Sequence, residues 1–194
     1  MLTTARECGF APTYDGLLCY TSIDSPIGTL GLAAAPSGIA MVEFGLDSNK
    51  VNMLAKKLKL TPSTAPCPLL DHCAAQLHDY FAGKLIHFSL PIVIVGTDFQ
   101  KKTWQALRTI PYGTTISYKR EAELAGSPQA FRAVGMANNA NQVCIVIPCH
   151  RVTNADGSLG GFGGGIEVKK QLLALEKATL KSQSEQKQEA NNKA

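Results

Sequence analysis

The feature that most constrains this chain is an apolar run, residues 143–147, that meets a proline and then three reactive side chains. The run predicts a buried strand, and Pro148 ends it because proline has no N–H to donate to a sheet. Cys149 should therefore lie at the mouth of a core element, followed by His150 and Arg151. Since a neighbouring imidazole or guanidinium lowers the pKa of a thiol, Cys149 is a candidate nucleophile. The alternative is a buried structural cysteine followed by polar surface residues.

A chain of 194 residues, 45% of them hydrophobic, can form one large domain or two small ones with a proper core. It lacks the run of ~18 apolar residues that would predict a membrane span, and residues 1–10 lack an apolar signal core. We therefore expect an intracellular, cytoplasmic protein with no membrane partner. Its six cysteines are then expected to be reduced thiols.

Positive charge gathers in one segment. Residues 100–152 carry a net charge of +5, whereas the whole chain carries +4, so the remainder is slightly acidic. Clustered cations are typical of a surface that binds phosphates, and a nucleic acid is the expected partner. A solvated basic face is the alternative. The cations are Lys101, Lys102, Arg108, Lys119, Arg120, Arg132 and Arg151.

The first half of the chain predicts a small α+β domain, residues 1–95. Short apolar runs separated by glycine and proline are typical of an antiparallel meander. Apolar residues at helical spacing predict two helices, and three prolines predict a loop between them. The expected strands are residues 21–27, 29–35, 39–44 and 90–95, the helices 50–60 and 69–81, and the loop 61–68.

The second half predicts a helix-turn-helix. Thr97 and Gln100 have the spacing of a capping box and should begin a helix that ends near residue 109. Ser117 should cap a short helix over 118–125, and Ser127 should cap the next, over 128–138, with Pro128 at its first position. An ordinary αα-hairpin is the alternative.

The second helix of this pair carries small residues at 130, 133, 135 and 137 and one cation, Arg132. Small side chains allow close entry into a narrow groove, whereas readers of base edges need long polar side chains. We therefore expect DNA binding without sequence preference, which argues against a helix-turn-helix transcription regulator.

Five glycines lie within residues 160–165, and we interpret them as a pocket wall whose backbone N–H groups approach a ligand; a flexible linker is the alternative. A last helix should span 166–180. On it, Glu176 shares an apolar face with Leu172 and Leu173, where a carboxylate needs a partner or a route to solvent. The tail, 181–194, is predicted to be disordered.

Two cysteines and two histidines that cluster in the sequence are candidate metal ligands. Their spacing matches no common zinc pattern, so we predict no metal. The residues are Cys67, His72, Cys73 and His78.

Together these motifs resemble the O6-alkylguanine-DNA alkyltransferases, also called methylated-DNA–protein-cysteine methyltransferases. The resemblance covers about residues 99–176. It rests on Pro148-Cys149-His150-Arg151, Ile116-Ser117-Tyr118, Ala133-Val134-Gly135, Asn141, residues 160–165 and Leu172-Leu173. It implies a ribonuclease-H-like supporting domain, 1–95, followed by a winged-helix-like helix-turn-helix domain with the active site, 96–180.

The resemblance also implies residue roles and a reaction. Cys149 would accept the alkyl group of O6-alkylguanine, and of O4-alkylthymine, once per molecule and without a cofactor; the other catalytic residues would be His150, Glu176 and Asn141. A monomer would bind double-stranded DNA through its minor groove and flip the damaged base out of the stack. The expected DNA- or substrate-binding residues are Tyr118, Arg132, Lys119, Ser127, Arg151, Val152 and Gly163.

The chain departs from many relatives at Gly163, where serine or alanine is common, and at Phe162, where tyrosine is common. Both changes leave the sulfur chemistry intact but put the substrate range in doubt. The main alternative function is a related lesion-binding protein without transferase activity, but such proteins lack the cysteine that stands here at 149. A papain-like hydrolase is disfavoured because its histidine lies far from its cysteine in sequence.

Overall fold

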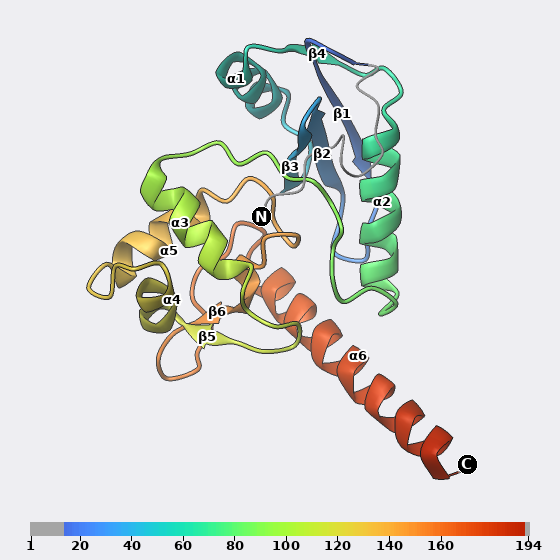
Figure 1. Ribbon diagram of the computed structural model, residues 1–194, viewed down its shortest axis with the longest axis vertical. Helices are drawn as coiled ribbons and strands as arrows, with labels where there is room; N and C mark the ends of the chain where they lie inside the picture. Colours follow the sequence, from blue (N-terminus) through green and yellow to red (C-terminus); the bar gives the residue numbers. More distant parts are fainter. Residues whose placement is uncertain (1–13, 193–194) are drawn as a thin grey trace.

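The structure, a computed structural model, describes residues 14–192 (Figure 1). Two groups of elements follow one another along the chain, and a long helix closes it. The elements are β1 (Leu17–Ile23), β2 (Leu30–Ala35), β3 (Gly38–Phe44), α1 (Ser48–Leu58), β4 (Thr61–Ser63), α2 (Pro68–Phe81), α3 (Asp98–Leu107), β5 (Ile116–Ser117), α4 (Tyr118–Leu124), α5 (Phe131–Asn139), the 3₁₀ turn η1 (Cys149–Arg151), β6 (Val152–Thr153) and α6 (Ile166–Asn192).

The first group is a four-stranded sheet in the order β3-β2-β1-β4, with a helix on each face. β1, β2 and β3 form the predicted antiparallel meander, and β4 lies parallel to β1. Because side chains alternate along a strand, Leu18 packs with α1 and its neighbour Cys19 packs with α2. Figure 1 shows α2 running along one side of this sheet.

The second group is the predicted pair of short helices with α3 packed against both. A small alanine-rich core joins them: Ala106, Ala122, Ala125 and Val134. Thr97 and Gln100 form the predicted capping box of α3, and the Ser117 hydroxyl caps α4 as predicted. The two-stranded parallel sheet β5–β6 ties the start of α4 to the residues after Cys149.

The two groups share one core. The edge strand β3 hydrogen-bonds the second half directly, since Val42 N donates to Gln142 O and Cys144 N donates to Val42 O, both at 2.8 Å. The largest cluster of buried apolar side chains includes Leu32 and Leu77 from the first group and Trp104 and Leu172 from the second. The segment that leads to Cys149 is thus anchored on a sheet edge.

In the first half, three predicted boundaries were wrong. The strand expected at residues 21–27 is β1, Leu17–Ile23, and it ends early because Ser25 to Gly28 form a turn in which Gly28 N donates to Ser25 O. Residues 61–63, expected in a loop, form strand β4, and its Pro62 is tolerated because β4 is an edge strand. Residues 90–95, expected as a strand, pair with the sheet only around Ile39, through Ile39 N to Pro91 O and Val93 N to Ile39 O. Pro91 itself has no N–H to extend this pairing.

In the second half, α5 begins at Phe131 and not at Pro128. Ser127 makes a turn instead of a cap, because its carbonyl accepts from Ala130 N. The apolar run 143–147 is not a strand either. Ile145 is in the left-handed region (φ 71°), and the chain folds back so that Cys144 pairs with Ile147.

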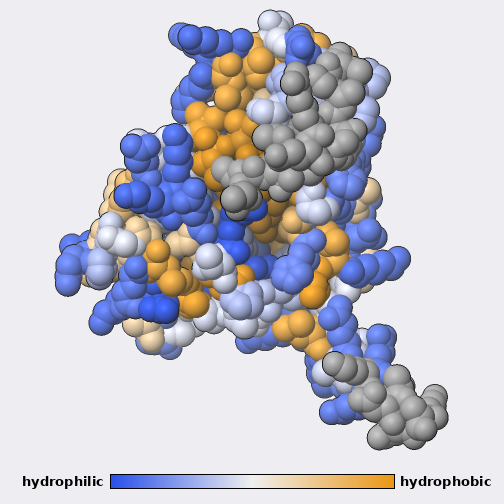
Figure 2. Space-filling view, viewed as in Figure 1, coloured by the Kyte–Doolittle hydropathy of each residue, from blue (hydrophilic) through white to orange (hydrophobic). Residues whose placement is uncertain are grey.

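The last helix is longer than expected. α6 continues to Asn192, whereas disorder was predicted from residue 181. Lysine, glutamine, glutamate and alanine are strong helix formers, and Lys181 lies 3.8 Å from Glu185 one turn on. Figure 1 shows that this part projects from the body, and those of its residues that are coloured in Figure 2 are mainly hydrophilic. No helix within residues 14–192 has the length and apolarity to cross a membrane.

Candidate active site

Asn141 braces the turn that presents Cys149. Its side-chain amide donates to Ile147 O (2.9 Å) and to Cys149 Sγ (3.2 Å), and its oxygen accepts from Val143 N (3.0 Å). One side chain therefore fixes both ends of the turn and touches the sulfur.

Cys149 opens η1, where the chain leaves Pro148, and it is 6% exposed. Cys149 lines a small cavity of about 70 Å³. A hydrogen bond from Cys144, a second from Asn141 and the positive charge of Lys169 lower the pKa of Cys149, against the opposing effect of burial. Cys144 has the opposite shift: its pKa is raised, so it remains a thiol and a donor.

His150 follows in the chain and is fully buried. Its Nε2 lies 2.8 Å from Glu176 Oε1. Burial lowers the pKa of His150 despite this carboxylate, so the ring is neutral near pH 7. A neutral ring that donates from Nε2 carries its lone pair on Nδ1, and Nδ1 is buried without a hydrogen-bond partner among the described atoms. The geometry therefore leaves Nδ1 as the basic atom.

Glu176 is the centre of the hydrogen bonding. It accepts from Arg151 Nε and Nη2 at 2.9–3.2 Å, from Gly113 N at 2.8 Å and from the Tyr80 hydroxyl at 2.9 Å, besides His150. Burial works against the carboxylate form, but hydrogen bonds from His150 and Arg151 lower the pKa of Glu176 to about 2. The carboxylate stays ionised and orients the imidazole.

Two residues expected to contact DNA lie elsewhere. Arg151 is buried, with Nη1 bonded to Ile110 O (2.8 Å) and its other donors on Glu176. Val152 is fully buried in β6. The resemblance implied contact with DNA or substrate at both positions, but Arg151 in the 3₁₀ turn and Val152 in β6 both have buried side chains. Arg151 is the charge partner of Glu176.

Lys169 was not anticipated. It is fully buried, and Nζ donates to Val152 O (2.6 Å) and Gly160 O (3.4 Å). It therefore fastens the strand after Cys149 to the start of the glycine-rich segment. The available signal was spacing, since Lys169 precedes Glu176 by two helical turns on the same face as Leu172.

Tyr118 is half-buried between α5 and the glycine-rich segment. A Cβ on Gly160 would lie 2.5 Å from the Tyr118 hydroxyl, so only glycine fits there. A Cβ on Gly163 would meet nothing within 4 Å, so the serine or alanine of relatives would fit equally well. Phe162 packs edge-on against Phe44, with centroids 5.3 Å apart, and forms part of the wall near His150.

The remaining predicted DNA-binding residues lie on the helix pair. Lys119 on α4 and Arg132 on α5 are exposed, and Ser127 is half-buried in the turn between the helices. The Arg132 guanidinium lies 5.9 Å from the centre of the Phe131 ring, which is itself 45% exposed. The structure does not place these side chains in the hydrogen-bonded cluster around Cys149.

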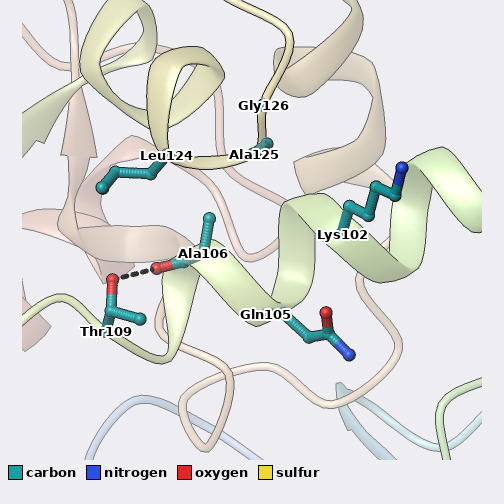
Figure 3. A pocket seen from close by; sticks show the side chains of 7 residues that line it. All are labelled: Lys102, Gln105, Ala106, Thr109, Leu124, Ala125 and Gly126. Carbon is teal, nitrogen blue, oxygen red and sulfur yellow. Dashed lines mark hydrogen bonds between the residues drawn. The ribbon is translucent and has the colours of Figure 1, made fainter.

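A larger hollow, about 430 Å³, lies between α3 and the end of α4 (Figure 3). Its only charged lining group is Lys102, and it contains no thiol, imidazole or carboxylate, so it offers no nucleophile. Within residues 14–192 no three histidine, cysteine or acidic side chains are grouped to hold a metal ion. The lining residues are Lys102, Gln105, Ala106, Thr109, Leu124, Ala125 and Gly126.

Comparison with known proteins identifies both halves of the chain. Residues 18–94 match the family described as "6-O-methylguanine DNA methyltransferase, ribonuclease-like domain", and residues 98–178 match "6-O-methylguanine DNA methyltransferase, DNA binding domain". The methylated-DNA–protein-cysteine methyltransferase of Methanosarcina barkeri is 41% identical over 84% of this chain and 99% of its own. That of Mycobacterium tuberculosis is 42% identical over 84% and 94%.

Solved structures agree. The O6-methylguanine methyltransferase of M. tuberculosis matches with a TM-score of 0.72 and 41% identity, over 84% of this chain and 94% of that one. M. tuberculosis OGT in complex with DNA matches with a TM-score of 0.71 and 42% identity, over 82% and 93%. The predicted two-part α+β architecture is thereby confirmed, and the chain belongs to the methylated-DNA–protein-cysteine methyltransferase family.

Proposed function

We propose that Cys149 removes the alkyl group from O6-alkylguanine, and from O4-alkylthymine, in double-stranded DNA. The observation that carries this proposal is the geometry of two consecutive residues: the Asn141 amide donates to the Cys149 sulfur at 3.2 Å, and the His150 imidazole that follows is held by the Glu176 carboxylate at 2.8 Å. Such an arrangement supports nucleophilic attack by sulfur at neutral pH.

The reaction begins with proton transfer. The Cys149 proton passes, through a water, to Nδ1 of His150, and Glu176 stabilises the imidazolium that forms. The thiolate then attacks the alkyl carbon. A carbon–sulfur bond forms as the carbon–oxygen bond breaks, and the electron pair returns to the base. A donor near the leaving oxygen favours this step, and we assign it to the Tyr118 hydroxyl and to the backbone N–H of Gly163.

The damaged base reaches the sulfur by leaving the DNA stack. We assign Arg132 to the gap in the duplex, Tyr118 to the flipped nucleotide, and Lys119 and Ser127 to the DNA backbone at the minor groove. The cavity at Cys149, about 70 Å³, has room for about two water molecules. A purine therefore enters only if residues that line the cavity move. Gly163 is one of them, and the run of glycines around it permits such a movement.

The product is a thioether, which water does not cleave, so each molecule acts once and needs no cofactor. The protein would act as a monomer, inside the cell, where its DNA substrate lies. Domain limits at residues 95–96 and 180 fit this proposal, with the first half supporting the second.

Mass spectrometry tests the proposal. After mixing with a duplex that contains one O6-methylguanine, the tryptic peptide 133–151 should gain one methyl group, and fragmentation should place it on Cys149. Cys149→Ser should gain none and still bind the duplex. More than one methyl removed per protein molecule, or a methyl group on Cys144 of the same peptide, would contradict the mechanism.

A further inference from the structure

A second thiol lies beside the nucleophile. Cys144 Sγ is 3.3 Å from the backbone oxygen of Asn141, whose side-chain amide is 3.2 Å from Cys149 Sγ. Both cysteines also line the same cavity of about 70 Å³. One asparagine thus holds two sulfurs at one opening.

The backbone between the cysteines is built to bring them together. Ile145 is a β-branched residue with φ 71°, a conformation that such residues rarely adopt. Val146 N donates to Cys144 O and Ile147 N to Val143 O, which folds the chain back on itself. An extended strand, as the sequence suggested, would separate residues 144 and 149. Strain maintained at such a position is a reason to seek a function for the contact.

We propose that Cys144 and Cys149 form a reversible disulfide when a hydroperoxide enters the cavity. The disulfide blocks the nucleophile while it lasts and protects it from irreversible oxidation. Cys144 acts as the resolving thiol.

The chemistry proceeds in two steps. The Cys149 thiolate attacks the O–O bond of the peroxide; a sulfur–oxygen bond forms, and the departing hydroxide or alkoxide takes up a proton. Cys144, losing its proton, then attacks the sulfur of this sulfenic acid; the disulfide forms and hydroxide leaves, to become water with that proton. The two thiols supply the two electrons that reduce the peroxide, and an external dithiol reverses the change.

The same chain contains a contrasting pair. Cys19 and Cys67 are also neighbours, both buried in the core cluster that contains Tyr14. Burial and the neighbouring Cys67 raise the pKa of Cys19 to about 11, so at neutral pH Cys19 has little thiolate to react. This pair is an internal control: two cysteines that are neighbours, without the lowered thiol pKa that Cys149 has.

Peptide mapping tests the proposal without DNA, so its result does not depend on alkyl transfer. Trypsin leaves both thiols in one peptide, residues 133–151. After hydrogen peroxide, unfolding and iodoacetamide, this peptide should lack two hydrogens and carry no alkylation; dithiothreitol should restore two alkylated cysteines. The peptides that contain Cys19 and Cys67 should be alkylated throughout.

The variant Cys144→Ala tests whether Cys144 protects Cys149 by forming the disulfide or whether Cys149 is simply inaccessible to peroxide. Peroxide should take its Cys149 to the sulfinic acid, which dithiothreitol does not reduce. Cys144→Ser, with a side chain of similar size, serves if the alanine variant folds poorly. The proposal is overturned if peroxide-treated wild-type peptide keeps both thiols free, or if Cys149 is over-oxidised equally in wild type and variant.

Discussion

Two buried glutamates in this protein have opposite properties. Glu176 on α6 accepts hydrogen bonds from four other residues, two of them Arg151 and His150, and its pKa falls to about 2. Glu121 on α4 is equally buried, but within residues 14–192 its carboxyl accepts a hydrogen bond only from the Asn138 amide, at 2.8 Å. Burial, which that bond only partly offsets, raises the pKa of Glu121 to about 8.

The difference shows that the partner, and not the depth of burial, decides the charge of an interior carboxyl. A fixed cation and several donors repay the loss of water at Glu176. At Glu121 one neutral amide does not, so this carboxyl is protonated near pH 7. Glu121 Oε1 and Asn138 Oδ1 remain without partners among the described atoms.

The largest effect should come from removing the charge of Glu176. Glu176→Gln leaves Arg151 buried without its counter-ion, and we expect a loss of about 3–5 kcal/mol in the free energy of unfolding. Urea denaturation at pH 7 measures it. Glu185→Gln on the exposed part of the same helix, which breaks the pair with Lys181, should cost under about 0.5 kcal/mol. Similar losses for the two variants would contradict the central place of Glu176.

The substitution Glu121→Gln should increase the free energy of unfolding, and the size of the increase should depend on pH. Between pH 4.5 and about 8 the folded state binds a proton that the unfolded state has released, so stability falls as pH rises. Glutamine imitates the protonated form and removes this loss. We expect little change at pH 4.5 and a gain of about 2–3 kcal/mol at pH 8.

Glu176 has the opposite effect on how stability changes with pH. Its lowered pKa contributes stability above its ordinary value of 4.5, and this is lost as pH falls towards 2. The Glu121→Gln variant should therefore still lose stability as pH falls towards 2, but it should no longer lose stability as pH rises from 4.5 to about 8. A variant that is less stable than wild type at pH 8 would show that Glu121 is ionised and paired.

These two sites also show what sequence can reveal. Glu176 was predicted because it breaks an apolar face, and Cys149 because thiol and imidazole are adjacent. Glu121 lies in a segment rich in charge, Lys119 to Glu123, where local pattern indicates solvent. Its burial depends on α5 packing over α4, which no local pattern encodes. Arg151 was misplaced for the same reason.

The apolar run 143–147 shows a second limit. Its composition fits a strand, but its conformation is decided by bonds from Asn141 and by pairing of residues 142–144 with Val42. Both are contacts between distant parts of the chain or between a side chain and the backbone. The order of the β-meander and the caps of α3 and α4, which are local, were predicted correctly.

A smaller effect, on rate, should follow from the cation that interacts with both Glu121 and Cys149. Lys169→Met removes a positive charge that favours the thiolate, and we expect iodoacetamide to alkylate Cys149 about tenfold more slowly at pH 7. Lys170→Met, which breaks an exposed pair with Glu167, is the matched control. If the rate falls equally at all pH values, Lys169 acts by fastening the loop and not through its charge.

The smallest effect on stability should come from removing one of the hydrogen bonds that Glu176 accepts. Tyr80→Phe removes the hydroxyl that donates to Glu176 Oε1 but keeps the ring, which packs against Phe81, Phe88 and Tyr112. Because His150, Arg151 and Gly113 still hold the carboxylate, we expect a loss of about 1 kcal/mol at pH 7. Tyr20→Phe, on β1 and away from Glu176, controls for loss of a phenol. A loss as large as that of Glu176→Gln would mean that the cluster forms or fails as a unit, since interaction energies in such networks are not additive.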